Sequence, residues 1–145
     1  MKAKLVVIGL LVAIAGVAAV SIYVSATIDK IDKAVAAVTS PDGRYKAVRV
    51  TLTRGGAAPF CVDSISIFLS VYPDNFAEND KTYEVYVAPC AAPAKRASLP
   101  RVEWLSNTAA QITYAFAVPA AGAEQPRMKP LDASHFVHVT FVAGK

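Results

Sequence analysis

An uncharged apolar run at residues 5–26 constrains this 145-residue chain more than any other feature. A helix of that length rises roughly 33 Å, and the hydrocarbon core of a bilayer is about 30 Å thick. The run is longer than the apolar region of a signal peptide, which favours a retained membrane anchor over a cleaved leader. Cleavage stays open as the alternative, because Lys2 and Lys4 supply a basic start and Val-Ser-Ala at 24–26 suits a signal peptidase.

The charges that flank this run predict an orientation. Lys2, Lys4 and the terminal amine stand on one side, and Lys30 and Lys33 stand on the other. This slim excess places the N-terminus in the cytoplasm and the C-terminal domain in the periplasm, anchored in the inner membrane. Cleavage would instead leave a periplasmic or secreted domain. The net charge of +4 is small and scattered, which argues against a nucleic-acid partner.

The residues after the apolar run predict a second, amphipathic helix at 27–39. Ile28, Ile31, Val35 and Val38 recur at helical spacing, with charged residues on the other faces. Pro41 would end this juxtamembrane helix. We therefore expect an anchor or signal peptide at 1–26, the amphipathic helix at 27–39 and an extracytoplasmic domain at 40–145.

The rest of the chain has the pattern of an all-β domain. Pro41, Asp42 and Gly43 are typical of a turn. Alternating apolar and polar residues then predict about six antiparallel strands, and no long helical pattern follows. The predicted strands are 45–53, 62–72, 82–88, 101–106, 111–116 and 135–143. Such a domain would fold as a small sandwich or a curled sheet.

The chain has two cysteines, Cys61 and Cys90, and this even number fits a disulfide in an exported domain. A disulfide between them would stabilise the fold by about 3.6 kcal/mol on the chain-entropy model. Two buried free thiols are the alternative. No Cys-x-x-Cys pair or histidine cluster favours zinc.

Catalytic and cofactor motifs are missing from the sequence. It holds no phosphate loop, nucleotide fingerprint, nucleophile elbow or zinc-protease motif. His135 and His138 are three residues apart on a predicted strand and so would face opposite ways. The acidic segment 72–81 matches no calcium loop, and a solvated hairpin explains its charges. We therefore expect that the protein is not an enzyme and that it binds neither a cofactor nor a metal ion.

Candidate contact residues come from aromatic strands and a basic loop. Trp104, Tyr114 and Tyr86 would form either an aromatic binding face or part of the core, and core packing is favoured. Lys95 and Arg96 would form a modest basic loop. A basic first strand, with Arg44, Lys46, Arg49 and Arg54 in or beside it, predicts a sheet edge guarded by charge.

Two motifs resemble a group of small bacterial proteins, exported or membrane-anchored and uncharacterised in activity. They are Ser-Pro-Asp-Gly-Arg-Tyr-Lys-Ala-Val at 40–48 and the Val-Glu-Trp-Leu-Ser hairpin that starts at 102. The resemblance covers about residues 40–141 and implies an architecture but no activity. In those relatives a cysteine often precedes the Gly-Ala segment. Here Arg54 precedes it and Cys61 follows it, so the resemblance implies no disulfide.

The turn motif is also similar to blades of TolB-type propellers. A propeller needs at least four blades of four strands, and about six strands are too few. The leading hypothesis is therefore a membrane-tethered extracytoplasmic β domain that acts by protein–protein interaction in the bacterial envelope, as an accessory subunit or an immunity-type inhibitor. The alternative is a cleaved, soluble periplasmic module that binds a small ligand.

Overall fold

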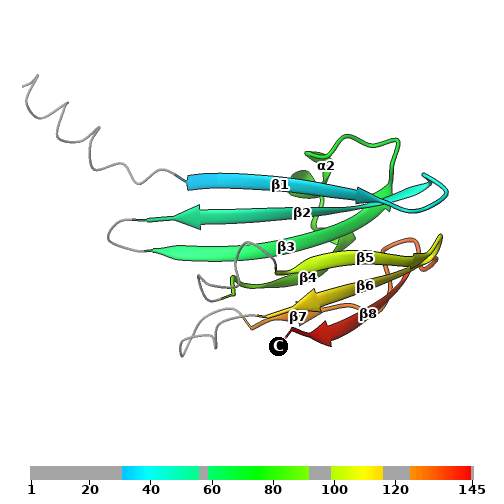
Figure 1. The fold of residues 1–145 in the computed structure, drawn as a ribbon. Helices are drawn as coiled ribbons and strands as arrows, with labels where there is room; N and C mark the ends of the chain where they lie inside the picture. Colours follow the sequence, from blue (N-terminus) through cyan, green and yellow to red (C-terminus); the bar gives the residue numbers. More distant parts are fainter. Residues whose placement is uncertain (1–30, 56–58, 92–98, 116–124, 145) are drawn as a thin grey trace, which may run out of the picture. The chain divides into compact units, whose positions relative to one another are not determined.

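The computed structural model describes residues 31–55, 59–91, 99–115 and 125–144, which form two packed β-sheets (Figure 1). The predicted anchor or signal peptide at 1–26 lies outside the described residues, as do Lys95 and Arg96. Within the described ranges, no helix has the length and hydropathy to cross a membrane.

The larger sheet has five antiparallel strands in the order β1-β2-β3-β4-β7. Its strands are β1 Ile31–Thr39, β2 Tyr45–Arg54, β3 Phe60–Leu69, β4 Glu84–Pro89 and β7 Arg127–Met128. A short helix α2, Phe76–Asn79, and a 3-10 turn η1, Lys81–Tyr83, connect β3 to β4.

The smaller sheet has three strands, in the order β5-β6-β8: β5 Arg101–Ser106, β6 Ala109–Tyr114 and β8 His138–Ala143. β5 and β6 form the predicted hairpin, but β6 and β8 run parallel, so the expectation of a wholly antiparallel domain is wrong at this pair. The reason is the connection between them. It contributes β7 to the other sheet before it returns, and such a crossover brings the chain back in the same direction.

The main core lies between the two sheets. β2 and β3 contribute Tyr45, Ala47, Ile65 and Ile67 to it, and the smaller sheet contributes apolar residues that include Ile112 and Val139. β4 contributes both Val85 and Tyr86, although strict alternation places them on opposite faces. A bulge explains this, because Ile65 pairs with Tyr86 and Ser66 with Glu84, which leaves Val85 as the extra residue.

A second, smaller core covers the outer face of the larger sheet. Val48, Val50 and Phe68 pack there against Ala77 of α2. Phe76 lies 5.2 Å from Phe68, measured between ring centroids, in an edge-on contact. The predicted core-forming face of β2, with Val48 and Val50, therefore packs on α2 and η1, while the opposite face makes the main core.

The predicted amphipathic helix over 27–39 is wrong from Ile31 onward, because Ile31–Thr39 form strand β1. All nine residues of β1 pair with β2, from Ile31 opposite Arg54 to Thr39 opposite Lys46. An isolated helix of this length is marginal in water, whereas β-branched residues suit a paired strand. The spacing of Ile31, Val35 and Val38 fits both structures, and the pairing with β2 decides between them.

The Pro-Asp-Gly turn consequently connects two strands, and it does not join a helical stalk to the domain. Ser40 N–H donates to the Tyr45 carbonyl oxygen at 2.8 Å, and the Ser40 hydroxyl donates to Asp42 Oδ1 at 2.7 Å. The same Asp42 oxygen accepts from Arg44 N–H at 3.1 Å. Gly43 has a φ of 73°, a left-handed conformation that glycine adopts without strain. The turn predicted from sequence is confirmed, but it closes a β1–β2 hairpin.

Candidate functional site

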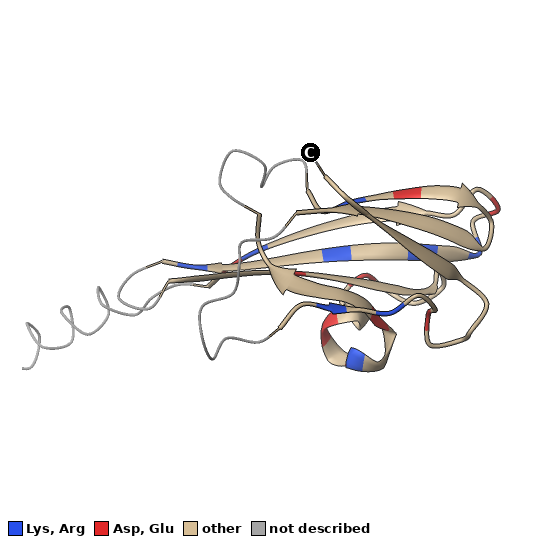
Figure 2. Ribbon diagram, turned by 90° about the horizontal axis from the view of Figure 1, so that it is seen from below, with Lys and Arg blue, Asp and Glu red and all other residues tan. Residues whose placement is uncertain are grey.

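Strand β1 is the exposed edge of the larger sheet. All nine of its residues are exposed, and among the described residues only β2 pairs with it. The prediction that the basic strand β2 forms the edge is wrong, because β1 covers it. The charges of β2 instead make specific ion pairs, Lys46 with Asp74 at 2.5 Å and Arg49 with Asp63 at 3.2 Å. In the view of Figure 2, basic and acidic positions are interspersed over the described domain.

The hairpin fixes which backbone groups of β1 point outward. Ser40 N–H bonds to the Tyr45 carbonyl, so Ser40 and Tyr45 form a hydrogen-bonded pair. Hydrogen-bonded pairs alternate along an antiparallel ladder, so the even-numbered residues of β1 bond to β2. The odd-numbered residues direct their backbone N–H and C=O groups away from β2. They are Ile31, Lys33, Val35, Ala37 and Thr39.

The composition of this edge leaves it unprotected over most of its length. Residues 34–39 contain no charge, proline or glycine, and proteins normally use such residues to stop edge strands from pairing. Ile31, Val35 and Val38 are 57%, 43% and 44% exposed. Of the two charged residues in β1, Lys33 is held by Glu78 of α2, with Nζ and Oε2 2.9 Å apart. This strand is therefore available for pairing with a further strand.

Trp104 ties this edge to the smaller sheet. Its indole Nε1–H donates to the Val38 carbonyl oxygen at 3.0 Å, which links β5 to β1. A groove of about 580 Å³ lies beside this contact. It is lined by Ala36, Val38, Ala47, Arg49, Leu99, Pro100, Arg101, Val102, Thr113 and Gly144. Trp104 is half-buried and packs against the main core, and its hydrogen bond supports the position of β1.

The other two aromatic candidates do not form a binding face. Tyr86 is 0% exposed and lies in the main core, which is the favoured of the two alternatives, so it is no surface contact residue. Tyr114 is half-buried, and its ring centroid lies 6.3 Å from that of Tyr86 and 6.5 Å from that of Phe141. The bulge in β4 explains the burial of Tyr86. Burial raises the pKa of its phenol far above the ordinary value, and the nearby Asp63 carboxylate raises it further.

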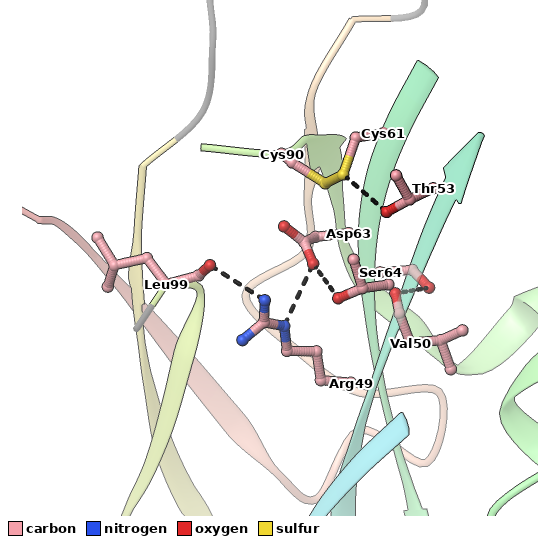
Figure 3. Close-up of a disulfide and its surroundings, with 9 residues drawn as sticks. Arg49, Val50, Thr53, Cys61, Asp63, Ser64, Cys90 and Leu99 are labelled. Atoms are coloured by element: carbon pink, nitrogen blue, oxygen red, sulfur yellow. Dashed lines mark hydrogen bonds and ion pairs between the residues drawn. A yellow bond between two sulfur atoms is a disulfide. The ribbon is translucent and has the colours of Figure 1, made fainter. Parts of the chain in front are cut away.

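A buried polar centre connects the sheets beneath the groove (Figure 3). Asp63 Oδ1 accepts from Arg49 Nε at 3.2 Å and from the Thr51 hydroxyl. The same guanidinium donates to the carbonyl oxygens of Leu99 and Pro100, both at 3.1 Å. Arg49 therefore joins the larger sheet to the segment that precedes β5. Because its donors serve these contacts, the guanidinium is a structural link.

Sequence reasoning missed this centre, although a signal for it exists. Asp63 has the same strand parity as Ile65 and Ile67, and Arg49 the same parity as Ala47, so both charges had to face the core. Asp63 Oδ2 and the Tyr86 hydroxyl find no hydrogen-bond partner in the described structure. The pairing of β2 with β3 would therefore have been enough to predict a buried ion pair between Arg49 and Asp63.

Cys61 and Cys90 form a disulfide, as the even number of cysteines suggested (Figure 3). Their Cα atoms are 5.3 Å apart. Cys90 N–H donates to the Cys61 carbonyl oxygen at 3.1 Å, so the bridge extends the β3–β4 ladder at its end. The bond fixes β3 and β4 together close to the buried Asp63.

Neither the histidines nor the acidic segment forms a metal centre in the described part of the chain. No group of three or more potential metal-binding side chains is found there. His135 and His138 are both exposed, and His135 lies in a turn before β8. In the acidic segment, Asp80 caps η1 by accepting from Thr82 N–H at 2.9 Å. Asp74 and Glu78 pair with lysines, as described above.

Comparisons with protein-family models, with curated proteins and with solved structures find no match to this chain. The resemblance to the small exported bacterial proteins therefore stays a prediction, and no activity is carried over from it.

Proposed function

We propose that this chain is a membrane-tethered extracytoplasmic β domain that acts by protein–protein interaction in the bacterial envelope, and that β1 is its contact surface. One observation carries the proposal, which is a nine-residue edge strand exposed along its whole length and uncharged over residues 34–39. Exposed sheet edges bind extended segments by backbone hydrogen bonds, and side chains of alternate residues select the partner.

Two further features support this role. The disulfide between Cys61 and Cys90 fits an oxidising compartment outside the cytoplasm. The apolar run at 5–26 would tether the domain to a membrane. An accessory subunit or an immunity-type inhibitor would use such an edge to dock on a membrane-bound partner.

Photo-crosslinking in membranes tests the proposal. A benzoylphenylalanine placed at Val35 puts the reactive group on the β1 edge, and the same group at Val71 is the control. Val71 is 80% exposed and lies beyond the end of β3. We expect a defined, stoichiometric crosslinked protein from position 35 and only weak, heterogeneous products from position 71. Equal yields from the two positions would contradict the proposal.

The groove supports the alternative of a small-ligand module. Its volume of about 580 Å³ falls within the range of small-molecule sites, and its walls are mostly apolar. Arg49 is engaged by Asp63 and by two carbonyls, and Arg101 pairs with Glu103, with Nη2 and Oε2 3.7 Å apart. The groove therefore favours a neutral, mostly apolar ligand. A larger residue at Ala36, such as Ala36→Leu, would fill the groove and abolish ligand binding. Protein binding through the outward edge of β1 would persist in the same variant.

A further inference from the structure

We infer that the partner of the β1 edge is a second copy of this chain, which pairs β1 with β1 antiparallel about a two-fold axis at Val35. This inference rests on the proposed function, since it names the occupant of the same edge. It would join two five-stranded sheets into one continuous sheet. Two-fold symmetric dimers, in which both copies use the same surface, are the commonest oligomers.

The backbone of β1 is self-complementary in this register. With Val35 opposite Val35, Lys33 lies opposite Ala37 and Ile31 opposite Thr39. Every hydrogen-bonded pair then joins two odd-numbered residues, and the odd-numbered residues are those with outward N–H and C=O groups. Each outward group of one copy thus meets an outward group of the other, over the whole of β1.

Neighbouring registers are worse. A two-fold axis at Lys33 would place two lysines directly opposite, and like charges opposite one another destabilise a sheet. An axis at Ala37 would pair only residues 35–39, and so would leave Ile31 and Lys33 without partners. An axis midway between two residues would pair odd-numbered with even-numbered residues, and so would set outward groups against groups already bonded to β2. An axis at Ala34 or at Ala36 would pair only residues 31–37 or 33–39. The Val35 register alone pairs all nine residues of β1 without opposing like charges.

The side chains agree with this register. Lys33 would face Ala37 and Asp32 would face Val38, so small or apolar residues oppose both charges. The two Lys33 side chains would stand four residues apart along the sheet, roughly 13 Å, which exceeds the Debye length of about 10 Å at 0.1 M salt. Each Lys33 is also neutralised by Glu78 of its own copy. The exposed side chains of Val35 would cover one another at the centre.

The strength of this dimer depends on the tether. A single strand pair is a small contact beside the ~1,200–2,000 Å² of standard stable interfaces, so the dimer should be weak in dilute solution. Anchoring both copies in one membrane raises their effective concentration without adding a contact. We therefore expect a dimer that forms in membranes and dissociates on dilution in detergent.

Cysteine crosslinking of the full-length chain in membranes tests the register. Paired residues in an antiparallel ladder have Cα atoms ~5.5 Å apart, which is within the range for a disulfide. Val35→Cys should form a disulfide-linked dimer on mild oxidation with diamide, at about tenfold the yield of the control Val71→Cys, because only position 35 meets its own copy. Ile31→Cys should crosslink to Thr39→Cys on a second, differently tagged chain, and far less to itself.

The outcomes separate this inference from the proposed function. Equal dimer yields from Val35→Cys and Val71→Cys, in variants that keep the Cys61–Cys90 disulfide, would overturn the dimer. If benzoylphenylalanine at Val35 then captures a protein of a different mass, the edge still acts as a contact surface and only the occupant is wrong. If position 35 also captures nothing above the control, both proposals fail.

Discussion

Trp104 donates its indole N–H to the carbonyl oxygen of Val38 at 3.0 Å, and so connects β5 of one sheet to the edge strand β1 of the other. β1 has one paired neighbour in the described structure, β2, and this bond links it to the smaller sheet. Trp104 therefore holds the exposed edge in position while leaving its outward backbone groups unobstructed.

Substitution Trp104→Phe should loosen β1 without unfolding the domain. It keeps an aromatic ring against the core but removes the donor to Val38, which is worth about 1 kcal/mol. Amide exchange measured by mass spectrometry should become faster over residues 31–39 and remain unchanged over β3. Unchanged exchange in β1 would show that the bond does not hold the edge.

Substitution Arg49→Ala should be strongly destabilising, by about 3 kcal/mol or more in the free energy of unfolding, because it leaves the buried Asp63 carboxylate without its cation. Urea denaturation measures the loss. The double variant Arg49→Leu with Asp63→Leu should recover much of it, since apolar residues replace the whole pair. If the double variant is as unstable as Arg49→Ala, the loss of stability does not come from an unpaired buried charge.

Loss of the disulfide should lower the free energy of unfolding by about 3.6 kcal/mol on the chain-entropy model, given a separation of 29 residues between Cys61 and Cys90. Replacement of both cysteines by alanine, followed by denaturation, measures this difference. In the unaltered protein, alkylation without reductant should label neither cysteine. Labelling of both would show that the bridge is absent.

The Asp42 carboxyl should titrate below the usual range for aspartate. The hydrogen bond from the Ser40 hydroxyl lowers its pKa most, and the Arg44 N–H lowers it further. A lowered folded-state pKa contributes stability above the unfolded pKa, and this contribution disappears as the pH falls through the lowered value. In Ser40→Ala, the titration midpoint of the Asp42 carboxyl group, followed by NMR of its carboxyl carbon, should rise. An unchanged midpoint would contradict the role of the hydroxyl.

Much of the β domain could be predicted from local patterns. The turn at Pro41–Gly43 and the hairpin of β5 and β6 follow from turn residues and alternation, and both are present. The strand ends shift by a few residues, as in β4, which starts at Glu84. Local alternation predicted these elements because each depends on neighbouring residues in the chain.

The missed features depend on contacts between distant segments. β1 has the spacing of a helix, and only its pairing with β2 makes it a strand. The bulge that buries Tyr86 is set by the pairing of β3 with β4, and the parallel pairing of β8 is set by the path through β7. The candidate site consists of such features, because a sheet edge exists only once the order of the strands is known.

Residue-resolved amide exchange of β1 in the full-length chain is the most direct test of the β1 edge as the contact surface. In dilute detergent, the outward amides of Lys33, Val35 and Ala37 should exchange quickly, while those of Ala36 and Val38 are protected by β2. In membranes, an occupied edge should slow the outward amides by about tenfold or more, because each gains an acceptor. Outward amides that exchange equally fast in membranes and in dilute detergent would contradict the proposed role of β1.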